Sequence, residues 1–125
     1  MRRLVLLAGL AVIAAGCGGA QVVSPVPGNT LVTQTTAAVP AEYANGDPVA
    51  GKKVFETAGC KACHTLADAG ATGTVGPNLD QTKPPLGAVV HQVVNGGGVM
   101  PAFKSQLSAK QIADVSAYVV KATSG

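Results

Sequence analysis

Residues 60–64 read Cys-Lys-Ala-Cys-His, a C-x-x-C-H motif. This pattern is the attachment signature of a c-type haem. Two thiols three positions apart can each add to one vinyl group of the same porphyrin, and the adjacent histidine is then held under the iron as its proximal ligand. The motif therefore predicts one covalent haem c, bound by Cys60 and Cys63 and ligated by His64.

Two other uses of such a motif can be weighed from the sequence. A thioredoxin-like dithiol needs a preceding strand and a βαβ context, and no β-rich run precedes Cys60. A structural zinc site needs four ligands, usually in two spaced pairs. After the N-terminal segment, the chain offers only Cys60, Cys63, His64 and His91, and His91 has no paired ligand. We therefore favour haem over a dithiol or zinc.

Met100 is the candidate for the second axial ligand. It lies in the segment Asn95-Gly-Gly-Gly-Val-Met-Pro-Ala-Phe103, which has the character of a loop. A methionine is often only core filler, but its setting beside Pro101 favours ligation. His91, the competing ligand, lies roughly 130° from the centre of the nearest apolar helical stripe, so we expect it at the surface.

The N-terminus has the features of an export signal. Arg2 and Arg3 precede a twelve-residue apolar stretch at 4–15, which is shorter than the about 20 residues that span a bilayer. The end of this stretch, Ile13-Ala-Ala-Gly-Cys17, resembles a bacterial lipobox, in which the cysteine becomes the acylated first residue. We expect cleavage after residue 16, lipidation of Cys17 and anchoring at a membrane.

Two alternatives to this anchor stay open, because Ala14 stands where a lipobox more usually has leucine or valine. A plain cleavage near Ala20 would release a soluble protein, and an uncleaved segment would itself be the anchor. In each case the protein is exported, to the periplasm or to the outer face of the cytoplasmic membrane.

Export also changes the charge balance. Without residues 1–16, the basic residues are seven lysines against six acids, which leaves +1 before haem propionates are counted. The basic isoelectric point is thus largely a property of the signal, and it does not indicate nucleic-acid binding. We expect a monomer that meets redox proteins and the membrane.

Three parts follow along the chain: a signal peptide at 1–16, a lipidated N-terminus and flexible linker at 17–46, and a haem domain at 47–125. Residues 18–46 are rich in Gly, Ser, Thr, Pro, Ala and Val and show neither a helical nor an alternating period. The haem domain has about 80 residues and no Trp, which is small for a self-sufficient core. A buried haem would supply an apolar centre.

The haem domain is predicted to be all-α with three main helices. The first begins with Asp47 as N-cap and Pro48 in the first position, and Gly59 ends it. The second runs from Pro84 to Val94, with an apolar stripe at helical spacing. The third opens with the capping-box pair Ser108 and Gln111. Its inward side chains are predicted to be Ile112, Val115 and Val119, and its outward ones Lys110, Asp114 and Lys121.

Two glycine-rich segments connect these helices. Residues 65–83 are predicted to form a long loop. Loops of this length are uncommon in small domains unless they contribute to a functional site, and wrapping the edge of a haem would be such a role. Gly96, Gly97 and Gly98 do not form a phosphate loop, since they follow a helix and no G-K-[ST] sequence comes after them. They are predicted to give the Met100 loop freedom to approach the porphyrin.

Residues 47–122 contain, in order, a helix, C-x-x-C-H, Gly76-Pro-Asn-Leu79, a second helix, Met-Pro and a last helix. In this order of features, the chain resembles the class I cytochromes c of the small bacterial type. The resemblance implies that the first and last helices cross through a small residue and aromatic contacts, at the positions of Gly51, Phe55 and Tyr118. It further implies that the backbone carbonyl of Pro77 accepts a hydrogen bond from the proximal histidine, which orients the ring.

The function expected from this combination is outer-sphere transfer of single electrons between respiratory or photosynthetic partners outside the cytoplasmic membrane. Both axial positions would be filled by His64 and Met100, so we expect no enzyme activity. Two alternatives are a fixed haem subunit of a larger oxidase, dehydrogenase or reductase, and a peroxidase or gas-binding protein in which Met100 leaves the iron open.

Overall fold

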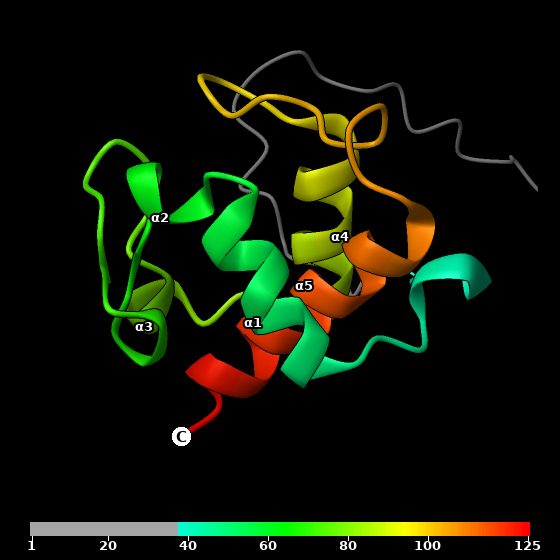
Figure 1. Cartoon of the computed structure of the whole chain (residues 1–125), viewed down its shortest axis with the longest axis horizontal. Helices are drawn as coiled ribbons and strands as arrows, with labels where there is room; N and C mark the ends of the chain where they lie inside the picture. The colour runs from blue at the N-terminus through cyan, green and yellow to red at the C-terminus, as the bar shows by residue number, and fades with distance from the viewer. Residues whose placement is uncertain (1–37) are drawn as a thin grey trace, which may run out of the picture. The chain divides into compact units, whose positions relative to one another are not determined.

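The computed structural model describes residues 38–125, so Cys17, the signal and most of the predicted linker lie outside the described residues. Three long helices dominate this part: α1 (Pro48–Thr57), α4 (Leu86–Asn95) and α5 (Ala109–Thr123). Figure 1 shows α1 crossing α5, with α4 beside them. The mostly helical architecture confirms the predicted all-α class.

The first helix forms for the local reasons that its sequence indicates. The Asp47 carboxylate accepts a hydrogen bond from the backbone N–H of Val49 at 2.8 Å, and Pro48 occupies the first turn. The helix ends before Gly59, whose φ of +89° turns the chain into the short helix α2 (Cys60–Cys63). Both predicted ends of α1 are thus confirmed to within a residue or two. The turn at Gly59 places the C-x-x-C-H motif directly after this helix.

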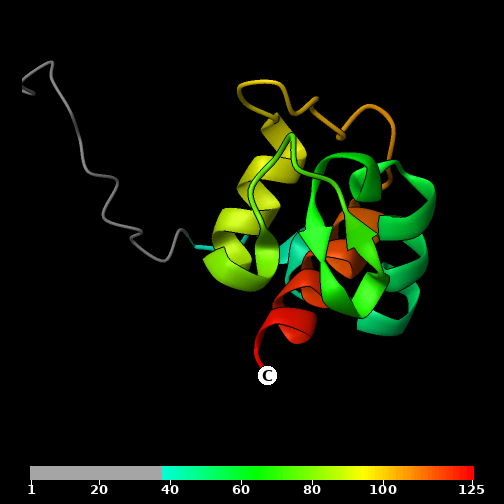
Figure 2. The ribbon, with the colours of Figure 1, turned by 90° about the vertical axis from the view of Figure 1, so that its left-hand side faces the viewer.

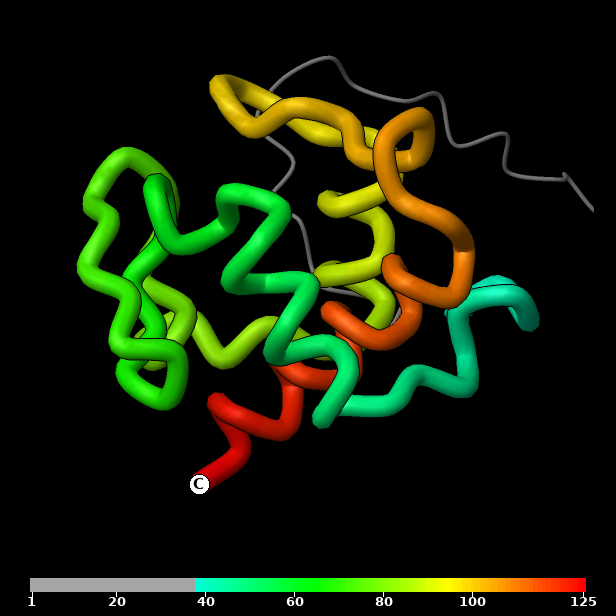
Figure 3. The backbone as a smooth tube through the Cα atoms, in the orientation of Figure 1, coloured from blue at the N-terminus to red at the C-terminus, as the bar shows by residue number. Residues whose placement is uncertain are grey.

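The crossing of α1 and α5 forms the centre of the core. A Cβ atom on Gly51 would lie 1.9 Å from the backbone oxygen of Asp114, so only glycine permits this approach. Beside it, the rings of Phe55 and Tyr118 pack edge to face, with centroids 5.7 Å apart. The predicted small-residue and aromatic crossing is confirmed, and Figure 3 shows how closely the two backbones approach.

The predicted orientation of Asp114 is wrong. The capping box of Ser108 and Gln111 starts α5 as expected, but Asp114 is buried. Its carboxylate accepts hydrogen bonds from the backbone N–H of Asp47, at 2.6 Å, and from the Lys110 ammonium. The helical period predicts the face of a helix on which a residue lies, but not which groups of another element pack against that face. Here the backbone N–H of Asp47, at the start of α1, lies against this face and donates to Asp114.

The second long helix starts two residues later than predicted. Pro84 is followed by a second proline, which disfavours the helical conformation at Pro84, and Pro85 is extended with ψ of 156°. From Leu86 onward the helix is regular, and Val89, Val90 and Val93 are buried as the apolar stripe predicts. His91 is exposed, also as predicted.

The predicted loop at 65–83 contains several short elements. Strands β1 (Thr65–Leu66) and β2 (Ala71–Thr72) pair antiparallel, and they are joined by the 3-10 turn η2 (Ala67–Ala69). The helical turn α3 (Leu79–Thr82) follows, and Figure 2 shows the strand pair beside it. Since Leu66 is fully buried, this segment belongs to the core rather than lying loosely over it.

Residues 41–46, which were predicted to belong to the linker, also pack on the helices. The 3-10 turn η1 (Ala41–Tyr43) contacts α5, and the half-buried Tyr43 packs against the core. The compact part therefore includes a few residues before Asp47. Within residues 38–125, no helix is both long and apolar enough to cross a membrane.

Candidate haem site

A cavity of about 640 Å³ opens between the helices and the loops. This volume lies within the range of about 300 to 1,000 Å³ typical of cofactor sites. The predicted ligands Cys60, Cys63, His64 and Met100 all line it. Apolar side chains from α1, α3, α4 and α5 and from the loop between α4 and α5 form much of the rest: Phe55, Leu79, Val89, Val93, Phe103 and Val115.

The two thiols are presented by α2, a single helical turn that begins after the left-handed Gly59. Neither cysteine is in a disulfide, and both are of intermediate exposure. Burial raises the pKa of the Cys60 thiol to about 11, and the neighbouring Cys63 adds to this shift. Cys60 is therefore a neutral thiol at neutral pH, available to form a thioether at the cavity wall.

The His64 ring is held by the loop that follows it. Its Nδ1 lies 2.9 Å from the backbone oxygen of Pro77, and a carbonyl oxygen only accepts hydrogen bonds. Nδ1 must therefore carry the proton, which leaves Nε2 with a free lone pair for a metal. Gly76 makes room for the ring, since a Cβ there would lie 2.7 Å from His64 Cε1. The predicted hydrogen bond between His64 and Pro77 is present.

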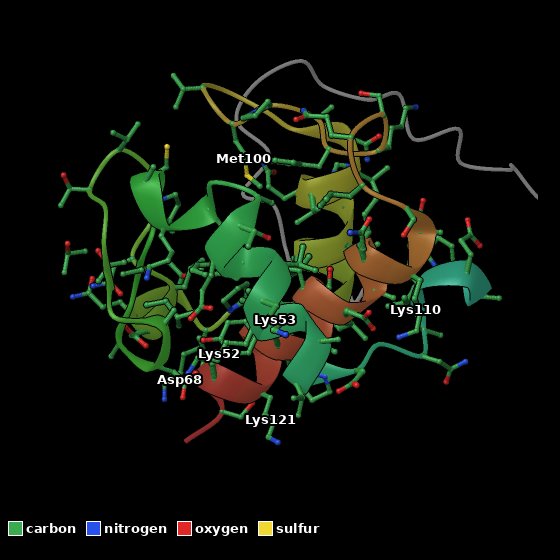
Figure 4. All side chains as sticks on the ribbon, in the orientation of Figure 1. Lys52, Lys53, Asp68, Met100, Lys110 and Lys121 are labelled. Carbon is green, nitrogen blue, oxygen red and sulfur yellow. The ribbon has the colours of Figure 1, made fainter. Side chains whose placement is uncertain are left out.

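Met100 reaches the cavity from the loop between α4 and α5, where Figure 4 labels it. The loop is a tight turn in which the backbone groups of Gly97 and Met100 exchange hydrogen bonds of 2.9 and 3.1 Å. Gly96, Gly97 and Gly98 all have positive φ, a conformation that favours glycine. Their role in letting Met100 approach the porphyrin stays a prediction. Farther along, the Phe103 N–H donates to the Val93 oxygen at 2.9 Å and fixes the loop to α4.

This donor set fits a covalent haem. Two thiols and an oriented imidazole lie on one segment, a thioether lies on another, and apolar side chains line the cavity between them. Within residues 38–125, no group of three or more His, Cys, Asp or Glu side chains is arranged to hold a metal ion directly. The exposed His91 does not line the cavity.

A side-chain network that the sequence does not predict surrounds Asp68. The Tyr118 hydroxyl donates to Asp68 Oδ2 at 2.6 Å, and the Lys52 ammonium lies 3.1 Å from the same oxygen. These two hydrogen bonds lower the pKa of Asp68. Burial, followed by the bond to Asp68, raises the pKa of Tyr118, so its hydroxyl keeps its proton. No local motif identifies this network, because its members come from three separate elements.

Residues 46–119 match the family model described as cytochrome C oxidase, cbb3-type, subunit III. The chain belongs to this cytochrome family. Among curated relatives, the cytochrome c6 of Limnospira maxima is 40% identical over 87 residues, which cover 60% of this cytochrome and 92% of the relative. The cytochrome c6 of Thermosynechococcus vestitus is 38% identical, covering 72% of this chain and 79% of that protein.

A solved structure gives the same result for the fold. The c-type cytochrome SorU from Sinorhizobium meliloti is 42% identical to this cytochrome and superposes with a TM-score of 0.58. The match covers 61% of this chain and 90% of SorU. Together with the C-x-x-C-H motif, these relatives establish covalent haem c as the cofactor.

Proposed function

We propose that this monohaem cytochrome c carries single electrons with its haem attached to Cys60 and Cys63 and ligated axially by His64 and Met100. One observation carries the proposal: a single cavity gathers both thiols, an imidazole of fixed tautomer and the Met100 thioether. The relatives named cytochrome c6 and the c-type cytochrome SorU support the same activity.

The protein's part in this function is to hold its ligands still. Bound haem supplies an iron that alternates between the ferric and ferrous states. The hydrogen bond to Pro77 keeps the His64 ring in one orientation, and the bonded turn at Gly97 restrains Met100. The mostly apolar walls would limit contact between water and a bound haem, which together with a thioether ligand favours a relatively high reduction potential.

Covalent attachment is tested by the double variant Cys60→Ala, Cys63→Ala. Without the two thiols no thioether can form, so the variant should release its haem into acidified organic solvent. The wild-type protein should retain its haem under the same treatment. The measurement is the haem absorbance of the extract relative to that of the precipitated protein. Equal extraction from both proteins would contradict the attachment.

Axial ligation by Met100 separates an electron carrier from an open-iron enzyme. Met100→Ala should vacate one coordination site, lower the reduction potential and allow the ferrous protein to bind carbon monoxide. The wild type should bind it poorly, and His91→Ala should leave the absorption spectrum unchanged because His91 is exposed and outside the cavity. Rapid binding by the wild type would favour a peroxidase or gas-binding protein.

We also propose that the cytochrome is exported and anchored through Cys17, with residues beyond it serving as a tether. The lipobox-like segment before Cys17 and the aperiodic, proline-containing stretch after it support this proposal. A membrane anchor would keep the carrier close to its redox partners and leave the haem domain free to move between them.

A second candidate function is that of a haem subunit fixed in a larger oxidase. The description of the matching family model names subunit III of a cbb3-type oxidase, which favours this candidate. The two functions differ in how the protein purifies from mild detergent extracts. A mobile carrier should elute at the size of a monomer, whereas a fixed subunit should elute with the other haem proteins of its complex.

A further inference from the structure

Asp68 joins the loop that follows His64 to both helices of the central crossing. From α5, the Tyr118 hydroxyl donates to Asp68 Oδ2 at 2.6 Å. From α1, the Lys52 ammonium donates to the same carboxylate oxygen at 3.1 Å and to the Asp68 backbone oxygen at 2.8 Å. Figure 4 shows Lys52 and Asp68 side by side, far along the molecule from Met100.

The loop that Asp68 anchors is bonded to itself at several points. The Thr65 hydroxyl donates to the Gly73 oxygen at 2.7 Å, and the Gly76 N–H donates to the Cys63 oxygen at 2.7 Å. The Ala67 N–H donates to Asp80 Oδ2 at 2.8 Å. Since these bonds lie on both sides of Pro77, they tie its carbonyl to β1 and η2.

Within residues 38–125, all hydrogen bonds between the segment 64–82 and either α1 or α5 pass through Asp68. Leu66 adds apolar packing, which resists separation but is not directional. The Asp68 bonds are directional, so they set the register of the segment against the helices. The Tyr118 ring is independently fixed by its edge-to-face contact with Phe55, itself part of the cavity wall.

We propose that Tyr118 and Lys52 are positioning residues that act through Asp68 to hold the Pro77 carbonyl on His64 Nδ1. The inference rests on the proposed role of His64 as the proximal ligand. A strong hydrogen bond to Nδ1–H makes the imidazole a better electron donor and thereby favours the ferric state. When the anchor is loosened, this bond weakens, and the reduction potential rises.

Tyr118→Phe is the cleanest variant, because it removes the hydroxyl and keeps the ring that packs on Phe55. Lys52→Gln removes the second anchor. Its matched control is Lys53→Gln, which removes the same charge from the next residue of α1, an exposed position without a hydrogen bond from its ammonium. The measurements, made on the haem-loaded protein, are the midpoint potential and the NMR exchange rate of the His64 Nδ1 proton.

Tyr118→Phe and Lys52→Gln should each raise the midpoint potential, and Lys53→Gln should leave it nearly unchanged. Loss of one hydrogen bond should speed exchange of the His64 ring proton roughly fivefold. If Tyr118→Phe is less stable but keeps the wild-type midpoint potential and the wild-type exchange rate of the His64 proton, the positioning role is overturned. Tyr118 would then have only a structural role. Equal shifts from both lysine variants would also overturn it, since charge alone would explain them.

These outcomes are separable from a failure of the proposed function. If His64 is not the proximal ligand, the wild type itself will lack the spectrum of a histidine-ligated haem, and its ring proton will not report on the iron. If His64 is the ligand but the Asp68 network does not position it, the wild-type spectrum will be normal and only the variants will fail to shift.

Discussion

The charge of Asp68 depends on two side chains that donate to it. The bonds from Tyr118 and Lys52, with the nearby charge of Lys121, lower its pKa from the usual 3.8. Because the folded pKa is the lower one, Asp68 stabilises the fold above pH 3.8, and this contribution is lost as pH falls through the folded pKa. Asp68→Asn should therefore be less stable than wild type at pH 6, and the two proteins should converge in strong acid. Urea unfolding across pH tests this, and a constant difference would contradict it.

Residues that act through local spacing could be predicted, whereas those that act across the fold could not. Cys60, Cys63 and His64 follow from one pentapeptide, and the hydrogen bond from His64 to Pro77 followed from a family resemblance. Asp68 carries no comparable signal. It is an exposed acid in a glycine-rich loop, and its partner Tyr118 lies 50 residues away in sequence. Only the packing of η2 against the crossing of α1 and α5 brings these side chains together.

At the scale of elements, the contact between α1 and α5 depends on the absence of a side chain at Gly51. In Gly51→Ala the new methyl group would meet the backbone of Asp114, which cannot move aside as a side chain can. The gain in helix propensity, about 1 kcal/mol, is too small to offset overpacking at a helix crossing. We expect a net loss of about 2 kcal/mol in the free energy of unfolding, measured in urea. Lys53→Ala, at an exposed site of the same helix, should change it by less than about 0.5 kcal/mol.

The sequence determines where a helix begins more fully than it determines which side chains of the helix are buried. Capping residues fix the start of α1 and α5 through bonds to their own first turns, so Asp47 and Ser108 were identified correctly. The burial of Asp114 depends instead on the backbone N–H of Asp47, 67 residues away, which no helical period contains. The short strands at Thr65 and Ala71 are too brief for an alternating pattern to reveal them.

At the scale of the whole molecule, the packed turn η1 sets where the compact haem domain begins. The compact part begins near Ala41 rather than at Asp47, so a tether starting at Cys17 would be a few residues shorter than the composition indicates. The residues of η1 do not line the haem cavity. The point at which a tether would join the compact part is therefore not in the cavity wall.

The anchor itself is tested at Cys17. If this cysteine is acylated, the mature protein should sediment with membranes and be released by detergent. High salt should not release it, because the two or three acyl chains of a bacterial lipoprotein bind through apolar burial, whereas lysine contacts are screened by ions. Cys17→Ser should abolish lipoprotein processing and leave haem insertion intact, since Cys60 and Cys63 belong to a separate site. Recovery of the wild type as a salt-soluble protein beginning near Gln21 would contradict lipidation. Electron transfer by the haem domain would be unaffected by that result, because every proposed haem ligand lies beyond either cleavage site.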